Sequence, residues 1–252
     1  MINSQMAELG NRPSVIREIF EYSNRRKAEI GADKVFDFSL GNPSIPAPIE
    51  VDNAIKELVE TCDSVALHGY TSAQGDMAVR KTIAKNITER FGAMADASNI
   101  YITCGAAASL TATLKAVCNS TDEVILLAPF FPEYNVFAQN AGAKTVAVCG
   151  TGENFTIDFN ALEKAINQNT AAIIVNSPNN PTGAIIPETI LKNWRNYLML
   201  RQSSMAEQFI LLPMSRIANS PTVTRCHIYL IFMIIRWYVI LTASRSLCPE
   251  NE

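Results

Sequence analysis

The chain has 252 residues, of which 48% are hydrophobic and 18% charged, and its formal net charge is -3. This balance is typical of a globular protein, and it excludes a disordered chain and a basic nucleic-acid-binding surface. The six cysteines show no paired metal-ligand spacing and there are only two histidines, so we expect no metal site. Residues 1–12 are polar and lack the apolar core of an export signal, which indicates a cytoplasmic protein.

The first ninety residues predict one strand among helices. Apolar side chains recur at helical spacing from Val15 to Phe20, which predicts an early amphipathic helix. The apolar segment 35–40 predicts a short strand that ends at Gly41. Two further helices are expected over 51–60 and 75–91.

From residue 100 onward, strands and helices alternate. The pattern predicts a strand over 100–103, a helix over 105–117, a strand over 123–127, a helix over 133–141, a strand over 144–148, a helix over 159–166 and a strand over 171–175. Such alternation is typical of an α/β fold, with a mostly parallel sheet that carries helices on both faces.

The segment from Asn193 to Glu252 has a different character. It contains no aspartate and no lysine, and it shows no clear helical or strand period. Within it, Ile228 to Ala243 is strongly apolar but is interrupted by Arg236. A membrane span needs about 20 apolar residues, so we do not expect this run to cross a membrane.

Four loops follow predicted strands, where ligands bind in open α/β sheets. The first, Gly105–Ala108, has small residues that let backbone N–H groups approach a phosphate at a helix N-terminus. Simple packing of small residues is the alternative. The second, Pro129–Tyr134, carries Phe131, whose ring can stack on a flat heterocycle or fill the core.

The other two loops are rich in turn-forming residues. The run Asn176–Gly183 reads N-S-P-N-N-P-T-G, a long and closely specified polar turn after a buried strand. The segment Leu40–Ser44 contains Gly41, which offers an unhindered backbone.

Together, the order and spacing of these loops resemble the class I and II aminotransferases, the fold type I enzymes that use pyridoxal 5′-phosphate. The resemblance extends from the N-terminus to Lys192. It implies an N-terminal arm over 1–48, an incomplete cofactor-binding large domain over 49–192 and an aberrant tail over 193–252. It also implies amino-group transfer between an amino acid, with aspartate as the default, and a 2-oxo acid, in a homodimer.

The resemblance assigns a role to seven residues. Gly105, Ala106 and Ala107 would surround the cofactor phosphate with backbone donors. Phe131 would stack on the pyridine ring and Asn180 would bind its phenolate oxygen. Tyr70 would reach the phosphate of the neighbouring subunit, and Gly41 would face the substrate carboxylate.

The family's catalytic lysine, which forms a Schiff base with the cofactor, cannot be assigned to any position. Relatives carry it after an aspartate and a tyrosine, in the part of the chain that corresponds to the tail. We therefore expect no catalytic residue, little or no transamination, and poor folding or aggregation because the sheet would keep an unpaired edge and an uncovered apolar face.

Our hypothesis for the tail is a change of reading frame near Lys192. When each codon is read from its third base, residues 213–219 permit D-E-P-Y-R-E, residues 240–247 permit S-Y-S-K-S-L-S, and the last residues permit L-P-G-E-R. These are the family's aspartate, tyrosine, lysine and arginine motifs in the family's order. The alternatives are a related carbon–sulfur lyase or aminocyclopropane-carboxylate synthase, or a non-catalytic protein with a hydrophobic C-terminal anchor.

Overall fold

A computed structural model describes the following parts of the chain: residues 2, 4–11, 15–39, 46–91, 95–152, 155–187, 189–190, 193, 228–235 and 239–245. The chain divides into two compact units, Met1–Pro46 and Ala47–Glu252. Each unit is described here by itself.

The first unit is helical. It contains α1 (Ser4–Asn11), α2 (Val15–Ile30) and the short 3-10 helix η1 (Ala32–Lys34). The sequence predicted α2 but not α1, whose eight residues show no clear apolar stripe.

The strand predicted over 35–40 is wrong for residues 35–39, which form no strand, and Leu40 lies outside the described residues. Phe36 and Phe38 are 83% and 92% exposed, so this segment buries neither aromatic ring in a sheet. It is held to α2 by a side chain instead, because the Lys27 ammonium donates a 2.7 Å hydrogen bond to Asp37.

The second unit begins with helices. These are α3 (Ile49–Thr61), α4 (Ser64–His68), α5 (Met77–Phe91) and the 3-10 helix η2 (Ala97–Asn99). The carboxylates of Asp63 and Asp96 accept hydrogen bonds from backbone N–H groups of the first turn of α4 and η2, which satisfies donors that a helix start leaves without partners.

The rest of this unit alternates between strands and helices. In chain order it contains α6 (Ala106–Val117), β1 (Glu123–Ala128), α7 (Glu133–Asn140), β2 (Lys144–Cys149), α8 (Phe159–Ala165), β3 (Thr170–Ser177), β4 (Ile228–Ile235) and β5 (Val239–Arg245). The elements predicted between residues 105 and 177 are confirmed to within a few residues.

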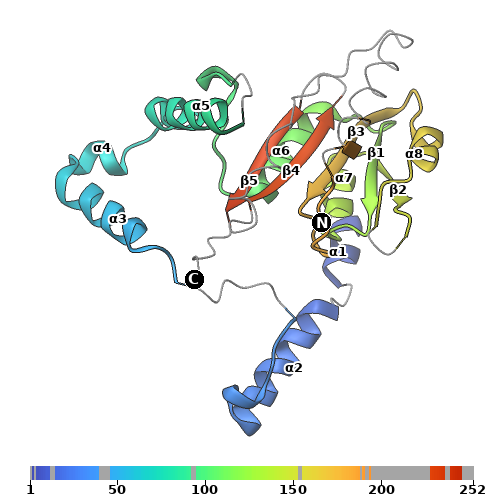
Figure 1. Ribbon diagram of the computed structural model, residues 1–252, viewed down its shortest axis with the longest axis horizontal. Coiled ribbons are helices and arrows are strands. Elements are labelled where there is room, and N and C mark those ends of the chain that lie inside the picture. The colour runs from blue at the N-terminus through green and yellow to red at the C-terminus, as the bar shows by residue number, and fades with distance from the viewer. Residues whose placement is uncertain are drawn as a thin grey trace. The chain divides into compact units, whose positions relative to one another are not determined.

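The strands form one sheet in the order β2-β1-β3-β4-β5. β1 lies between β2 and β3 and pairs with both in parallel. The last two strands are antiparallel, β4 to β3 and β5 to β4 (Figure 1). They lie in the tail, for which the sequence showed no strand period. An aliphatic run can still pair with an open sheet edge, since pairing satisfies its backbone groups.

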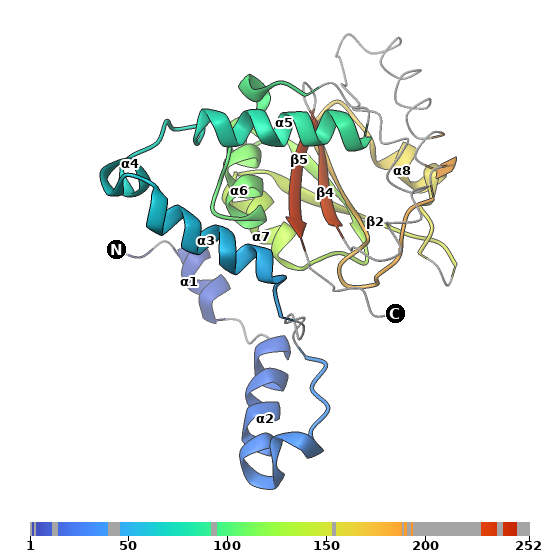
Figure 2. The same ribbon diagram turned by 60° about the vertical axis from the view of Figure 1, so that its left-hand side comes forward.

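Two apolar clusters occupy the two faces of the sheet. Along β1, Val124 and Leu126 pack with α6 and α7, whereas Ile125 packs with the α8 side. This alternation follows from the two-residue period of a strand. Figure 2 shows α6 and α7 together beside the sheet, with α8 apart from them. The predicted α/β fold with helices on both faces is thereby confirmed.

The strand predicted over 100–103 is wrong. These residues form no ladder; the Ile102 N–H instead donates to the Gln74 carbonyl oxygen at 3.0 Å. An apolar run becomes a strand only when another strand lies beside it. Within the described chain, this run meets the loop before α5 instead.

Candidate functional site

The carboxyl ends of β1, β2 and β3 meet at one edge of the sheet, because the three strands are parallel. The loops after β1 and β3 touch there, where the Asn179 side-chain amide donates to the Pro129 carbonyl oxygen at 3.2 Å. Helix α6 packs on the sheet and leads through five residues, 118–122, into the start of β1. It therefore runs antiparallel to β1, and its N-terminus faces the same edge.

Gly105 shapes the N-terminus of α6. Its φ of 101° and ψ of 171° are adopted readily only by glycine. No side chain caps the helix at this position, and a Cβ on Gly105 would meet no atom within 4 Å. The N-terminus of α6, with Ala106 and Ala107 in its first turn, thus has no side-chain cap at Gly105, and a helix N-terminus can bind an anion through its N–H groups.

The segment before Gly105 is fixed by Thr103. Its hydroxyl donates to the Gly105 carbonyl oxygen at 3.0 Å and lies 2.5 Å from the hydroxyl of Ser109. These two contacts join the approach to α6 with the helix's own first turn. We call Gly105, Ala106 and Ala107 the α6 cradle.

Phe131 lies in the loop after β1 and is half-buried. It packs against the cluster beneath α6 and α7, and its ring centroid lies 5.7 Å from that of Tyr134 in an edge-to-face arrangement. The core interpretation of Phe131 is therefore partly correct, and its stacking on a flat heterocycle stays a prediction. One part of the ring is packed, and the residue lies at the edge where a ligand can reach it.

Tyr134 and Asn176 form a buried polar pair behind Phe131. Burial raises the pKa of Tyr134 to about 12, and a side-chain hydrogen bond with Asn176 opposes this shift. Within the described chain, the Oδ1 atom of Asn176 is buried without a hydrogen-bond partner. The sequence analysis missed this pair, although a polar residue at the end of the apolar strand β3 was a signal for it.

The turn after β3 is organised by Asn179. Its Oδ1 atom accepts hydrogen bonds from the N–H and the hydroxyl of Thr182, at 3.2 and 3.0 Å. Its backbone bonds to Ala184 and Gly183 at 2.8 and 2.7 Å. Asn180 is exposed, and its amide makes no hydrogen bond to any described residue. Asn179 therefore shapes the turn, and the amide of Asn180 stays available to a ligand.

A cavity of about 280 Å³ opens near this edge. Its lining includes Pro129, Asn179 and Thr182, and much of it comes from the α8 face of the sheet. None of Gly105, Ala106, Ala107, Phe131, Asn180 and Tyr70 lines it, and neither does any lysine. The structure thus brings three predicted loops to one edge without enclosing their predicted residues in a common pocket.

Tyr70 does not lie at this edge of the sheet. Tyr70 is fully exposed in the segment between α4 and α5. Its role towards a neighbouring subunit stays a prediction. Gly41 lies outside the described residues.

Comparisons with known proteins identify the family of this chain. A family model for aminotransferase class I and II matches residues 33–196, a range that includes the α6 cradle and the turn after β3. The chain belongs to the class I and II aminotransferase family.

Individual relatives carry the same kind of name. A probable aspartate aminotransferase of Methanocaldococcus jannaschii is 29% identical over 192 residues, which are 76% of this chain and 47% of the relative. A (5-formylfuran-3-yl)methyl phosphate transaminase of the same organism is 34% identical over 167 residues, or 66% of this chain and 42% of the relative. The chain spans about half the length of these relatives.

Solved structures show the same fold. The crystal structure of an amino transferase from Eubacterium rectale matches with a TM-score of 0.78 and 48% sequence identity, over 82% of this chain and 52% of the other. An aspartate aminotransferase from Thermotoga maritima matches with a TM-score of 0.67 and 25% identity. The fold of this aminotransferase chain therefore corresponds to about half the length of these solved structures.

The described residues contain neither a membrane-spanning helix nor a cluster of metal ligands. No described helix has the length and apolar character to span a bilayer. The described chain has no group of three or more Asp, Glu, His or Cys side chains that could hold a metal ion.

Proposed function

We propose that this chain is the cofactor-binding half of a pyridoxal-phosphate-dependent aminotransferase, and that it is inactive because it lacks the lysine that forms the Schiff base. The observation that supports this proposal best is the α6 cradle. A glycine with positive φ precedes an uncapped helix, at the edge of the sheet where the Phe131 and Asn180 loops also lie. We further propose the domain division 1–48, 49–192 and 193–252, and a cytoplasmic location.

The residues of this edge fit the cofactor at three points. The N–H groups of the α6 cradle would hold the phosphate, since a helix N-terminus carries partial positive charge. Phe131 would stack on the pyridine ring, and Asn180 would donate its amide hydrogen to the phenolate oxygen. When bound, pyridoxal phosphate supplies an aldehyde that captures amino groups and a ring that accepts electrons.

Proton movement is the step that the chain does not support. A general base must reach the α-carbon of the amino acid, and the family's lysine cannot be assigned to any position of this chain, which has no lysine after Lys192. Binding and orientation of the cofactor are what the chain's own residues would still provide.

The substrates follow from the reaction class. An amino acid and a 2-oxo acid would exchange the amino group in the intact enzyme, with Gly41 near the substrate carboxylate. Aspartate is the default donor, but the relatives' names also include aromatic amino acids and LL-diaminopimelate. In a homodimer, the exposed Tyr70 would reach the partner's phosphate.

The test compares two glycines. We expect this chain to bind pyridoxal 5′-phosphate without a covalent bond, and Gly105→Ala to weaken that binding by about tenfold, because the φ of 101° strains any residue with a side chain. Gly152→Ala is the matched control. Gly152 also has a positive φ, of 68°, and open space around a Cβ, but it lies in the β2–α8 connection.

Equilibrium dialysis measures the affinity, and borohydride reduction followed by peptide mapping detects any lysine bound to the cofactor. The proposal predicts weaker binding in the Gly105 variant alone and no lysine labelled above a background level. Equal loss in both variants would place the phosphate elsewhere, and one lysine labelled in full would show that the chain retains covalent chemistry.

A further inference from the structure

Arg80 is a buried cation that has no carboxylate partner among the described residues. It lies in the first turn of α5 and is 2% exposed. The salt bridges of the described chain do not include it. A buried guanidinium is costly unless its donors are satisfied, so its hydrogen bonds show what it holds in place.

The acceptors of Arg80 come from two separate segments. Its Nε donates to the Gly75 carbonyl oxygen at 3.1 Å, and its Nη1 donates to Gln74 Oε1 at 2.9 Å. Nη1 also donates to the Ala97 carbonyl oxygen at 2.8 Å. One rigid, planar group therefore joins the loop before α5 to the 3-10 helix η2.

The same loop is fastened to the residues that follow η2. The Gln74 amide donates to the Tyr101 hydroxyl at 2.8 Å, and the Ile102 N–H donates to the Gln74 carbonyl oxygen at 3.0 Å. Gly75 lies so close to Ile102 that a Cβ would come within 2.9 Å of the Ile102 side chain. Glycine is required here for close approach as well as for its positive φ.

These contacts form a continuous path. Tyr70 lies five residues before Gly75, at the start of the loop. On the other side, Ile102 is followed by Thr103, whose hydroxyl bonds to Gly105 of the α6 cradle. The Tyr70 loop and the approach to the cradle are thus joined through Arg80 and Gln74.

We propose that Arg80 is a positioning residue that holds the Tyr70 loop against the segment leading into the α6 cradle, so that the two phosphate-facing elements move as one body. The proposal rests on the proposed function for the roles of Tyr70 and the cradle. In a dimer in which Tyr70 serves the partner, Arg80 would couple the cradle of one subunit to the site of the other.

The first arm of the test uses the ligand-free chain. Hydrogen exchange is measured at Gly75 and Ile102, whose N–H groups donate to Ser72 and Gln74. Arg80→Met should raise exchange at both amides by about tenfold, because three charge-assisted hydrogen bonds are lost. Arg80→Lys should restore part of the protection, since an ammonium group can reach fewer of the acceptors.

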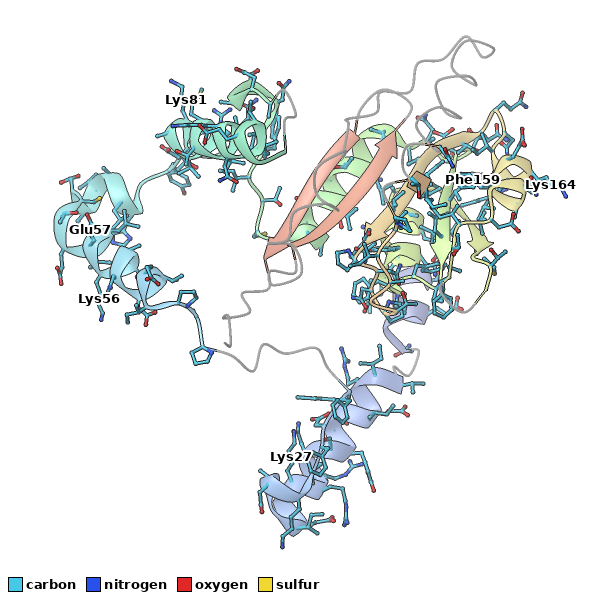
Figure 3. All side chains as sticks on the ribbon, viewed as in Figure 1. Lys27, Lys56, Glu57, Lys81, Phe159 and Lys164 are labelled. Atoms are coloured by element: carbon cyan, nitrogen blue, oxygen red, sulfur yellow. The ribbon has the colours of Figure 1, made fainter. Side chains whose placement is uncertain are left out.

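Two controls keep this arm specific. Lys81→Met changes the neighbouring, exposed cation of α5, labelled in Figure 3, and should leave both amides unchanged. Exchange at Ile125 in β1 reports global unfolding. If Arg80→Met does not fold, Tyr101→Phe can be used instead. It removes only the hydrogen bond between the Gln74 amide and the Tyr101 hydroxyl and should raise exchange at Gly75 by about threefold.

The second arm adds inorganic phosphate. In the unchanged chain, protection at Ala106 and Ala107 should be accompanied by protection at Gly75. In Arg80→Met, phosphate should still protect Ala106 and Ala107 from exchange, but it should no longer protect Gly75.

Three results would overturn the inference: exchange at Gly75 and Ile102 unchanged by Arg80→Met, an equal rise at Ile125, or a Gly75 response to phosphate that persists in the variant. Failure of phosphate to protect Ala106 and Ala107 in the unchanged chain is a different result. It would contradict the proposed function, and the ligand-free arm would still decide the role of Arg80.

Discussion

At the scale of single residues, the carboxylate of Asp37 has an environment that favours its charged form. The Lys27 ammonium lies 2.7 Å from it, and Ser39 donates two hydrogen bonds, from its N–H at 3.0 Å and its hydroxyl at 2.6 Å. The Lys27 hydrogen bond, followed by those of Ser39, lowers the pKa of Asp37 well below its usual range.

Folding lowers the pKa of Asp37. Its carboxylate therefore stabilises the folded state fully only at a pH where the same group is also charged in the unfolded chain. The contribution of Asp37 is therefore fully present at neutral pH. It is lost progressively as the pH falls from about 4, the ordinary value of an aspartate, through the lower pKa of the folded state.

Lys27→Met should raise the pKa of Asp37, which would still stay below its ordinary value because the Ser39 hydrogen bonds remain. An NMR titration of the carboxyl carbon measures this pKa. Lys34→Met is the control, since Lys34 is an exposed lysine of the same unit. Equal titration of Asp37 in the two variants would show that Lys27 is not the main cause.

At the scale of elements, α6 is held to the sheet by two leucines. Leu114 is 0% and Leu110 1% exposed, and both pack in the cluster with Val124 and Leu126. The position of the cradle depends on this packing, because the first turn of α6 is fixed in space only as firmly as the rest of the helix.

Leu114→Ala should lower the free energy of unfolding by about 2–5 kcal/mol, because it removes buried methyl groups and leaves a cavity. Urea denaturation measures this change. Lys115→Ala alters the next, exposed residue of the same helix and should stay within about 0.5 kcal/mol of the unchanged chain. A similar loss in both variants would contradict the packing assigned to α6.

The elements that the sequence predicted correctly are those with a local signal. β1 and β3 are uninterrupted apolar runs, and α6 follows a glycine and is rich in alanine. The strands expected over 35–40 and 100–103 are also rich in apolar residues. They failed because a strand also needs a neighbour, which local periodicity does not reveal.

The residues of the candidate site also divide into those that a local sequence motif predicts and those that it does not. The small residues of the cradle and the polar turn after β3 were visible as motifs. The structural roles of Arg80, Tyr134 and Asn179 were not visible, because each acts through partners distant in sequence: Ala97, Asn176 and Pro129. A polar residue at an apolar position is the signal that such partners exist, but it does not identify them.

At the scale of the whole molecule, the chain spans about half the length of its relatives. The match to the probable aspartate aminotransferase from Methanocaldococcus jannaschii covers 47% of that protein's length. The family match ends at residue 196, close to Lys192, where the proposed change of reading frame lies. After that position the chain has no lysine. The proposed change of reading frame would place the α6 cradle and the catalytic lysine in different parts of the gene, so cofactor binding and catalysis could be tested separately.

The most direct test inserts one base at the Lys192 codon and measures amino transfer from aspartate to 2-oxoglutarate, with pyridoxal 5′-phosphate, by the resulting protein and by the present chain. We predict that the restored frame encodes D-E-P-Y-R-E and S-Y-S-K, that its product transfers amino groups from aspartate or another amino acid, and that the present chain does not. A restored product with no transaminase activity towards any amino acid, or a present chain that is equally active, would contradict the account.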